Sequence, residues 1–204
     1  SLKGTVHVSI AEIENNGGPG IVAKDNVDIV AVHANANKGT GIRSFDSVTV
    51  AVREGSQGNQ VNGNQGYGIS VETLDSDAGV AITGAIEIQN NAAAGIFADG
   101  PVLVNTAEGR PTSRQTSTIS NNGKGTAAWI TPAPESKAGS VNCQTQCDAA
   151  GVSSDHGSVS AWYLTASNNG THGVYAARDA LLATGTLAHN GGYGVAVGGS
   201  LTGR

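Results

Sequence analysis

A short motif recurs along almost the whole chain, and it constrains the fold more than any other feature of the sequence. The motif reads NNGGPGIVAKD at 15–25, NGNQGYGISVE at 62–72 and SNNGTHGVYAARD at 167–179. Eight copies can be aligned, at spacings of 21 to 31 residues. Repeats of this length are single supersecondary units, which bury their apolar side chains by packing against the next repeat.

Three columns of the aligned repeats carry the pattern. The residue on which the copies align is glycine in seven copies and Thr126 in the eighth, and an apolar residue follows it in all eight. Four residues before this position, one copy has Cys147 and the other seven have asparagine: Asn16, Asn37, Asn64, Asn91, Asn122, Asn169 and Asn190. Seven residues before it, seven copies have an aliphatic residue or alanine, and the exception is Gln144: Ile13, Ala34, Val61, Ile88, Ile119, Ala166 and Leu187.

Each repeat is expected to form a short strand, a turn and another strand. Alternating apolar residues at 48–50, 80–82 and 102–104 predict the second strand of three repeats. The recurring glycine suits a backbone position that needs a positive φ or a close approach. The recurring asparagine tolerates the left-handed region, and its amide can hydrogen-bond to the repeats on either side.

These motifs resemble the right-handed parallel β-helix, the pectate-lyase-like superfamily, whose members carry asparagine ladders at a tight turn. The resemblance covers nearly the whole chain and implies an all-β, single-stranded right-handed parallel β-helix of about eight coils. We therefore expect one domain over 1–204, as a segment of a larger protein, with insertions at 105–117 and 131–146. Leucine-rich, hexapeptide and calcium-binding nonapeptide solenoids fit less well, because their repeat signatures are absent.

The charge and hydropathy of the chain limit the classes of partner that it can bind. Eleven Lys and Arg against 16 Asp and Glu give a formal net charge of −5, and no basic run is present, which argues against nucleic acid. No apolar stretch approaches the roughly 18 residues that a membrane span needs. Neither end carries a capping element, so we also expect self-association through the end coils.

The strand that follows the recurring glycine has an outward face on which related enzymes bind sugar polymers. Arg43, Phe97 and Tyr175 occupy outward positions there, and Trp129 lies nearby. Aromatic faces pack against the apolar C–H surface of sugar rings, so these four residues are candidates for binding a polysaccharide or a cell-surface glycan. The alternative is that these aromatics only cover protein surface.

Acidic residues follow the same strands and form the candidate catalytic set. Glu72, Asp99, Asp155 and Arg178 stand just beyond the strand in successive repeats, with His156 beside Asp155. The resemblance implies a calcium ion and an Arg or Lys base in such a setting, and Glu72 and Asp99 are the candidate calcium ligands, since carboxylates this close repel each other. Alternatively, aspartates at strand ends accept backbone hydrogen bonds in Asx-turns.

Two further residue sets call for separate interpretations. Cys143 and Cys147 have no third cysteine and no histidine partner, which argues against a zinc site. In an oxidising compartment we expect a disulfide that pins the 131–148 region, and the alternative is two reduced thiols. Cys147 would then replace a lost asparagine of the ladder. His172 precedes a repeat glycine at a variable position, and we expect it to be an exposed turn residue.

Two hypotheses for function follow. The outward strand face is poor in acids and bases, which favours a non-catalytic segment of a secreted or cell-surface protein that acts as a stalk, an adhesin or a glycan-contacting surface. The alternative is a polysaccharide lyase or glycoside hydrolase of the same superfamily. No cofactor other than calcium is indicated.

Overall fold

The computed structural model describes residues 4–52, 58–73, 77–105, 116–123 and 149–203. All regular elements in these segments are β-strands, and every pairing between them is parallel. Across the same residues, none of the structure is a helix that could cross a membrane. The all-β prediction is confirmed.

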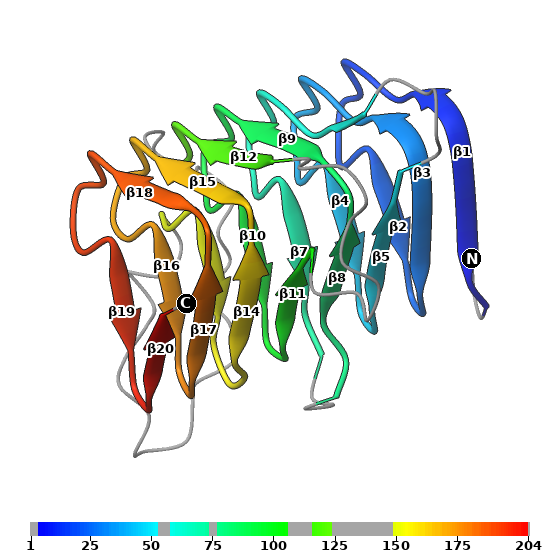
Figure 1. Ribbon diagram of the computed structural model, residues 1–204. Coiled ribbons are helices and arrows are strands. Elements are labelled where there is room, and N and C mark those ends of the chain that lie inside the picture. The colour runs from blue at the N-terminus through cyan, green and yellow to red at the C-terminus, as the bar shows by residue number, and fades with distance from the viewer. Residues whose placement is uncertain (1–3, 53–57, 74–76, 106–115, 124–148, 204) are drawn as a thin grey trace.

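The first of two sheets contains the strands that follow the recurring glycine. Their order in the sheet is their order along the chain, so each repeat pairs with the repeat after it (Figure 1). The seven strands are β2 (Ile21–Ala23), β4 (Ile42–Ser44), β7 (Ile69–Val71), β10 (Ile96–Ala98), β13 (Val152–Ser154), β16 (Val174–Ala176) and β19 (Val195–Val197).

The second sheet contains the remaining thirteen strands in two runs that meet at the long strand β3. One run includes the strands predicted at 48–50, 80–82 and 102–104, which are confirmed as β5, β8 and β11. The first run is β5 (Val48–Ala51), β8 (Val80–Thr83), β11 (Val102–Val104), β14 (Val159–Trp162), β17 (Ala180–Ala183) and β20 (Leu201–Gly203). The second is β6 (Asn59–Gln60), β9 (Ile86–Gln89), β12 (Ser117–Ser120), β15 (Leu164–Ser167) and β18 (Thr186–Ala188), and β3 (Val27–His33) also pairs with β1 (Val6–Glu12).

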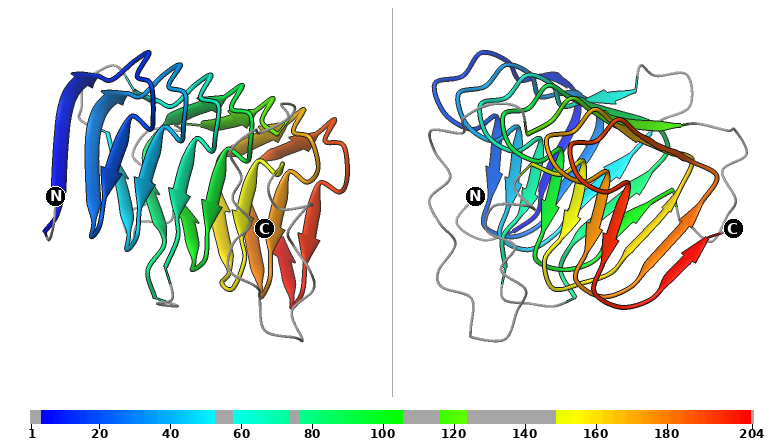
Figure 2. Two further views of the ribbon diagram at one scale, coloured as in Figure 1. Left: turned by 180° about the vertical axis from the view of Figure 1, so that it is seen from behind. Right: turned by 90° about the vertical axis from the view of Figure 1, so that its left-hand side faces the viewer.

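The sheets enclose an apolar core that runs the length of the molecule. Seen along the direction in which strands are added, successive repeats follow nearly the same outline (right panel of Figure 2). Ile42, Ile69 and Ile96 lie opposite one another in adjacent strands, and all three are fully buried. Alternate residues of a strand point to the same face, so a strand of three residues directs its first and third side chains into this core.

Buried asparagines form a continuous hydrogen-bonded ladder beside the core. Each ladder asparagine donates its side-chain amide to the side-chain oxygen of the next one, at 2.8–3.2 Å. The same oxygen accepts the backbone N–H of the preceding asparagine. From Asn37 to Asn190, each amide also donates to a backbone carbonyl of the preceding repeat, for example Asn91 to Val61. The residue that supplies this carbonyl stands seven residues before the recurring glycine, at the position where the sequence has apolar residues.

The left-handed residue of this turn is the one before the ladder asparagine. Seven residues hold this position at φ values between 53° and 67°: Asn15, Ala36, Gly63, Asn90, Asn121, Asn168 and His189. Asparagine and glycine tolerate this region best, which explains the frequent Asn-Asn pair in the sequence.

The recurring glycine is required for close approach, and its φ is not positive. A Cβ built on Gly68 would lie 2.5 Å from the carbonyl oxygen of Gly95 and 2.6 Å from a methyl carbon of Ile88. Gly41, Gly95, Gly151 and Gly173 are equally crowded by the next repeat. The sequence allowed either a positive φ or a close approach at this glycine, and the structure shows the close approach.

One predicted repeat boundary is wrong. Asn122 bonds directly to Asn169, and Ile96 pairs with Val152, so no ladder position lies between Asn122 and Asn169. Cys147 therefore does not replace a ladder asparagine. Residues 124–148 connect Asn122 to the segment before β13 and include Thr126, Cys143 and Cys147; they lie outside the described residues, as does most of the 105–117 insertion.

Candidate functional site

The central residues of the seven-stranded sheet form one row on the side of the sheet away from the core. On each strand at least one neighbour of the central residue belongs to the core cluster or packs against it, so alternation places the central side chains on the opposite face. The row consists of Val22, Arg43, Ser70, Phe97, Ser153, Tyr175 and Ala196. It includes three of the four predicted glycan-binding residues; Trp129 lies outside the described residues.

The middle of this row is covered. Ser70 and Ser153 have no exposed surface, and Phe97 keeps only 9%. The Phe97 ring also stacks on Tyr67, with ring centres 5.2 Å apart. Phe97 is thus packed against protein groups and is not open to a sugar ring, whereas Arg43 and Tyr175 are partly exposed.

Arg43 and Glu72 form an ion pair across two adjacent repeats. Ser70 donates a hydrogen bond of 3.2 Å to the same carboxylate, and the Arg43 guanidinium lies over the Phe45 ring, 4.7 Å from its centre. Glu72 is therefore neutralised by a cation from its own sheet. The Nε atom of Arg43 is buried without a hydrogen-bond partner.

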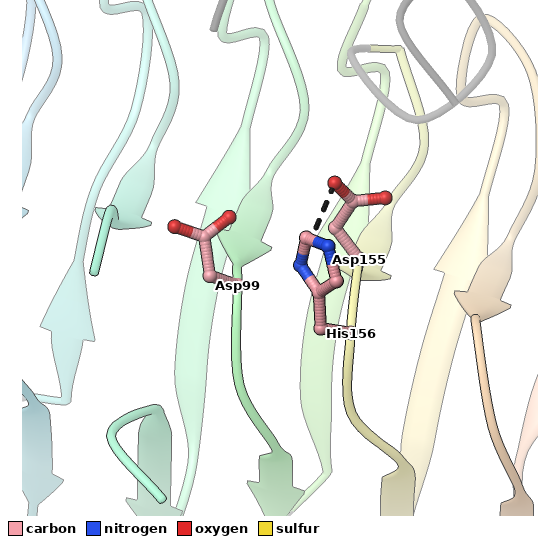
Figure 3. A group of neighbouring side chains, drawn as sticks. All are labelled: Asp99, Asp155 and His156. Atoms are coloured by element: carbon pink, nitrogen blue, oxygen red, sulfur yellow. Dashed lines mark ion pairs between the residues drawn. The ribbon is translucent and has the colours of Figure 1, made fainter. Parts of the chain in front are cut away.

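Asp99, Asp155 and His156 form a second cluster, at the carboxyl ends of β10 and β13 (Figure 3). One oxygen of each carboxylate and one imidazole nitrogen all lie within 4.8 Å of one another. The His156 Nδ1 atom is 3.8 Å from an Asp155 oxygen. Two residues of the predicted catalytic set are thus brought together.

Backbone hydrogen bonds fix the three residues of this cluster relative to one another. The Asp155 N–H donates to the Ala98 carbonyl and the His156 N–H donates to the Asp99 carbonyl, both at 2.9 Å. The connection from β13 to β14 has four residues, 155–158, whereas that from β10 to β11 has three, 99–101. The extra residue sets His156 beside Asp99.

The charged residues that follow the strands of the seven-stranded sheet fall into two rows, according to how far each stands from the end of its strand. Glu72, Asp99 and Asp155 each occupy the first position after their strand, whereas Asp46 and His156 occupy the second. Arg178 also occupies the second position, after β16, and its side chain is exposed. No contact joins Arg178 to the acidic cluster among the ion pairs and hydrogen bonds of the described residues.

Burial and neighbouring charges shift two pKa values at this cluster. Burial raises the pKa of Asp99, Asp155 and Glu72 raise it further, and a hydrogen bond from the Thr73 N–H at 2.7 Å and the nearby His156 act in the opposite direction. Burial and the charge of Asp155 raise the pKa of Tyr175. Tyr175 thus lies within electrostatic reach of the cluster.

The rings of Tyr175, His172 and Tyr193 form a stack. His172 packs against Tyr193 and Tyr175, with ring centres 5.5 Å and 6.2 Å apart and interplanar angles of 13° and 22°. His172 is 5% exposed, so the prediction of an exposed turn residue is wrong. Its Nδ1 atom accepts a hydrogen bond from the Tyr193 N–H, and burial lowers its pKa. Tyr193 forms the open end of the stack, at 69% exposure.

Two serines at equivalent positions of the outward row behave differently. Ser70 donates to Glu72, two residues further along the chain. Ser153 precedes Asp155 by the same two residues, yet its buried Oγ atom has no partner. Sequence reasoning missed both serines, Tyr193 and the role of His172; the Ser-x-Glu and Ser-x-Asp spacing is the signal that could have found the serines.

A polar groove of about 380 Å³ lies at the other end of these strands, at the asparagine turn. Its lining contains no titratable side chain and consists of Gly63, Asn64, Gln65, Asn90, Asn91, Ala92 and Asn121. The titratable groups therefore gather at one end of the strands and the amides at the other.

No family model, curated protein or solved structure matches this chain. The candidate site is therefore interpreted from its own geometry.

Proposed function

We propose that this chain is a right-handed parallel β-helix of the pectate-lyase-like superfamily, with one coil for each ladder asparagine. Parallel strands that pair repeat by repeat and the buried asparagine ladder support this proposal. We further propose a non-catalytic role, as a glycan-contacting segment of a secreted or cell-surface protein.

The stack of Tyr175, His172 and Tyr193 is the observation that carries the glycan proposal. Its rings are nearly parallel, and the outermost, Tyr193, presents an exposed aromatic face. An aromatic face of this kind packs against the C–H surface of a sugar ring, while hydroxyl groups of the sugar hydrogen-bond to nearby polar groups. Asp155 acts on Tyr175 electrostatically and therefore provides a polar edge to the same surface.

Retention on immobilised polysaccharides tests this proposal. Wild-type protein should be retained on at least one acidic or neutral polysaccharide, and Tyr193→Ala should lose most of that retention. Leu103→Ala is the matched control, because Leu103 is an exposed apolar residue on β11 of the other sheet. Equal losses in the two variants, or no retention of the wild type on any polysaccharide, would rule out this role for the stack.

A second function is supported by the Asp99–Asp155 pair. Two carboxyl groups held close together are the requirement for acid–base cleavage of a glycosidic bond, and burial raises the pKa of one of them. In this polysaccharide lyase or hydrolase, calcium would be held by Asp99 with Glu72, which is also bonded to Arg43. New unsaturated or reducing ends, lost in Asp155→Asn, would establish the enzyme; intact polymer under all conditions would exclude it.

A further inference from the structure

The cluster at the ends of β10 and β13 differs from the neighbouring one in how its charge is balanced. Glu72 is paired with Arg43. Among the ion pairs of the described residues, neither Asp99 nor Asp155 pairs with a lysine or an arginine. Two carboxylates within 4.8 Å repel each other unless a proton or a cation lies between them.

Ser153 provides an independent sign that a group is bound here. Its Oγ atom is buried and has no hydrogen-bond partner among the described residues, and Ser153 stands two residues before Asp155, as Ser70 stands two residues before Glu72. At the equivalent place in β7, Ser70 gives its proton to Glu72. A buried hydroxyl without a partner is unfavourable, and a water or an oxygen ligand held at the cluster would supply one.

We propose that Asp99, Asp155 and His156 bind one divalent transition ion, with zinc as its representative. Each residue would contribute one ligand atom, two carboxylate oxygens and the imidazole nitrogen, and the remaining position would hold water within reach of Ser153. This inference concerns a metal site and does not depend on glycan contact.

The spacing of the three ligand atoms suits a small ion. Ligand atoms on one tetrahedral zinc are about 3.3 Å apart, given metal–ligand distances near 2.0–2.1 Å. The observed Nδ1-to-oxygen distance between His156 and Asp155 is 3.8 Å. The three ligand atoms as a set lie within 4.8 Å of one another, so side-chain rotations, above all of His156, which is 56% exposed, would have to bring them to this spacing when the ion binds.

The chemistry of the donors selects the class of ion. Calcium prefers six to eight oxygen ligands, whereas the described residues of this group supply two carboxylates and an imidazole. A neutral imidazole nitrogen beside carboxylates suits zinc and its first-row neighbours. The site thus differs from the calcium site predicted from Glu72 and Asp99, because Glu72 is bonded to Arg43 and His156 takes its place.

Titration of the full chain with zinc at neutral pH tests the proposal. The two cysteines are reduced and alkylated first, so that thiolates do not compete for the metal. Wild type should bind one zinc per chain, and His156→Gln and Asp155→Asn should each weaken the binding at least about tenfold, as loss of even an indirect metal partner does. His7→Gln is the matched control, because His7 also lies 3.0 Å from a carboxylate, that of Asp28, but belongs to no group of three such ligands among the described residues.

Two readouts keep the test independent of folding and of glycan binding. Circular dichroism should be the same for all four proteins, because His156 and His7 are largely exposed. Cobalt in place of zinc should give visible absorption in the wild type and in His7→Gln and little in His156→Gln. The proposal is overturned if wild type binds no stoichiometric zinc, if His156→Gln binds it as wild type does, or if calcium displaces zinc at equal concentration.

Discussion

The two ends of the strands in the seven-stranded sheet are built on opposite principles. At the amino ends, each repeat has the same asparagine, and its amide and carbonyl oxygen bond to the repeats on either side. At the carboxyl ends, the residues and their partners vary from repeat to repeat: Glu72 is paired with an arginine, while Asp99 and Asp155 lie beside a histidine.

This difference shows which end maintains the fold and which end is free to carry chemistry. A group that bonds to its copy in the next repeat must be kept in every repeat, because one missing member leaves two neighbours unsatisfied. The carboxyl ends are under no such constraint, since backbone hydrogen bonds between repeats hold them together and the side-chain bonds there differ from repeat to repeat, as in Thr73 to Asp99 and Ser154 to Gly100. The following predictions test this comparison.

The largest effect is expected from crowding the asparagine end. Gly68→Ala places a Cβ 2.5 Å from the Gly95 carbonyl oxygen, so the free energy of unfolding should fall by about 3 kcal/mol. Gly17→Ala is the control, because a Cβ there meets nothing within 4 Å. Chemical denaturation measures both, and comparable values for the two variants would show that the close approach of the repeats is not required.

Removing a central ladder amide should have the next largest effect. Asn91→Ala leaves the Asn64 N–H and the Val61 carbonyl without their buried partners and should cost about 2 kcal/mol. The end member Asn16 is exposed, so Asn16→Ala should cost less.

The matched change at the acidic end is Asp99→Asn, which keeps an acceptor for the Thr73 N–H and removes a buried charge. It should not destabilise the fold at neutral pH. If Asp99→Asn costs as much as Asn91→Ala, the division between a structural end and a chemical end is wrong.

A smaller effect is expected when the pH is lowered, because protonation of His172 in the ring stack changes the stability of the fold. Burial lowers the pKa of folded His172 below its ordinary value of 6.5, so folding favours the neutral imidazole. Its contribution to stability is present above pH 6.5 and is lost as the pH falls through the folded-state pKa. Between pH 7 and 5, His172→Gln should therefore lose less stability than wild type. His7→Gln, at an exposed histidine, is the control, and parallel stability curves for wild type and His172→Gln would contradict this role.

The smallest effect should come from removing the backbone strain at the left-handed residue of one turn. Ala36 has a φ of 53°, where an L residue with a Cβ is disfavoured, so Ala36→Gly should stabilise the protein by about 0.5 kcal/mol. The same substitution at Ala81, in the middle of β8, should destabilise it by about 0.5–1 kcal/mol. Thermal unfolding measures both, and the prediction requires shifts of opposite sign.

Much of the architecture is encoded locally and could be predicted from the sequence alone. Alternation of apolar residues defined the strands at 48–50, 80–82 and 102–104, because a strand places every second side chain on one face. The recurring asparagine predicted the ladder, since one residue per repeat brings identical amides into contact.

The tertiary structure alone decided which side chains meet at the candidate site. The direct bond from Asn122 to Asn169 shows that 124–148 adds no ladder position, a fact that spacing along the chain concealed. One extra residue after β13 brings His156 beside Asp99, whereas Arg178, which the sequence grouped with them, follows in the next repeat with an exposed side chain that makes no ion pair among the described residues. Contacts between repeats depend on register across strands and on the length of each connection, and neither can be read from the residues of a single repeat.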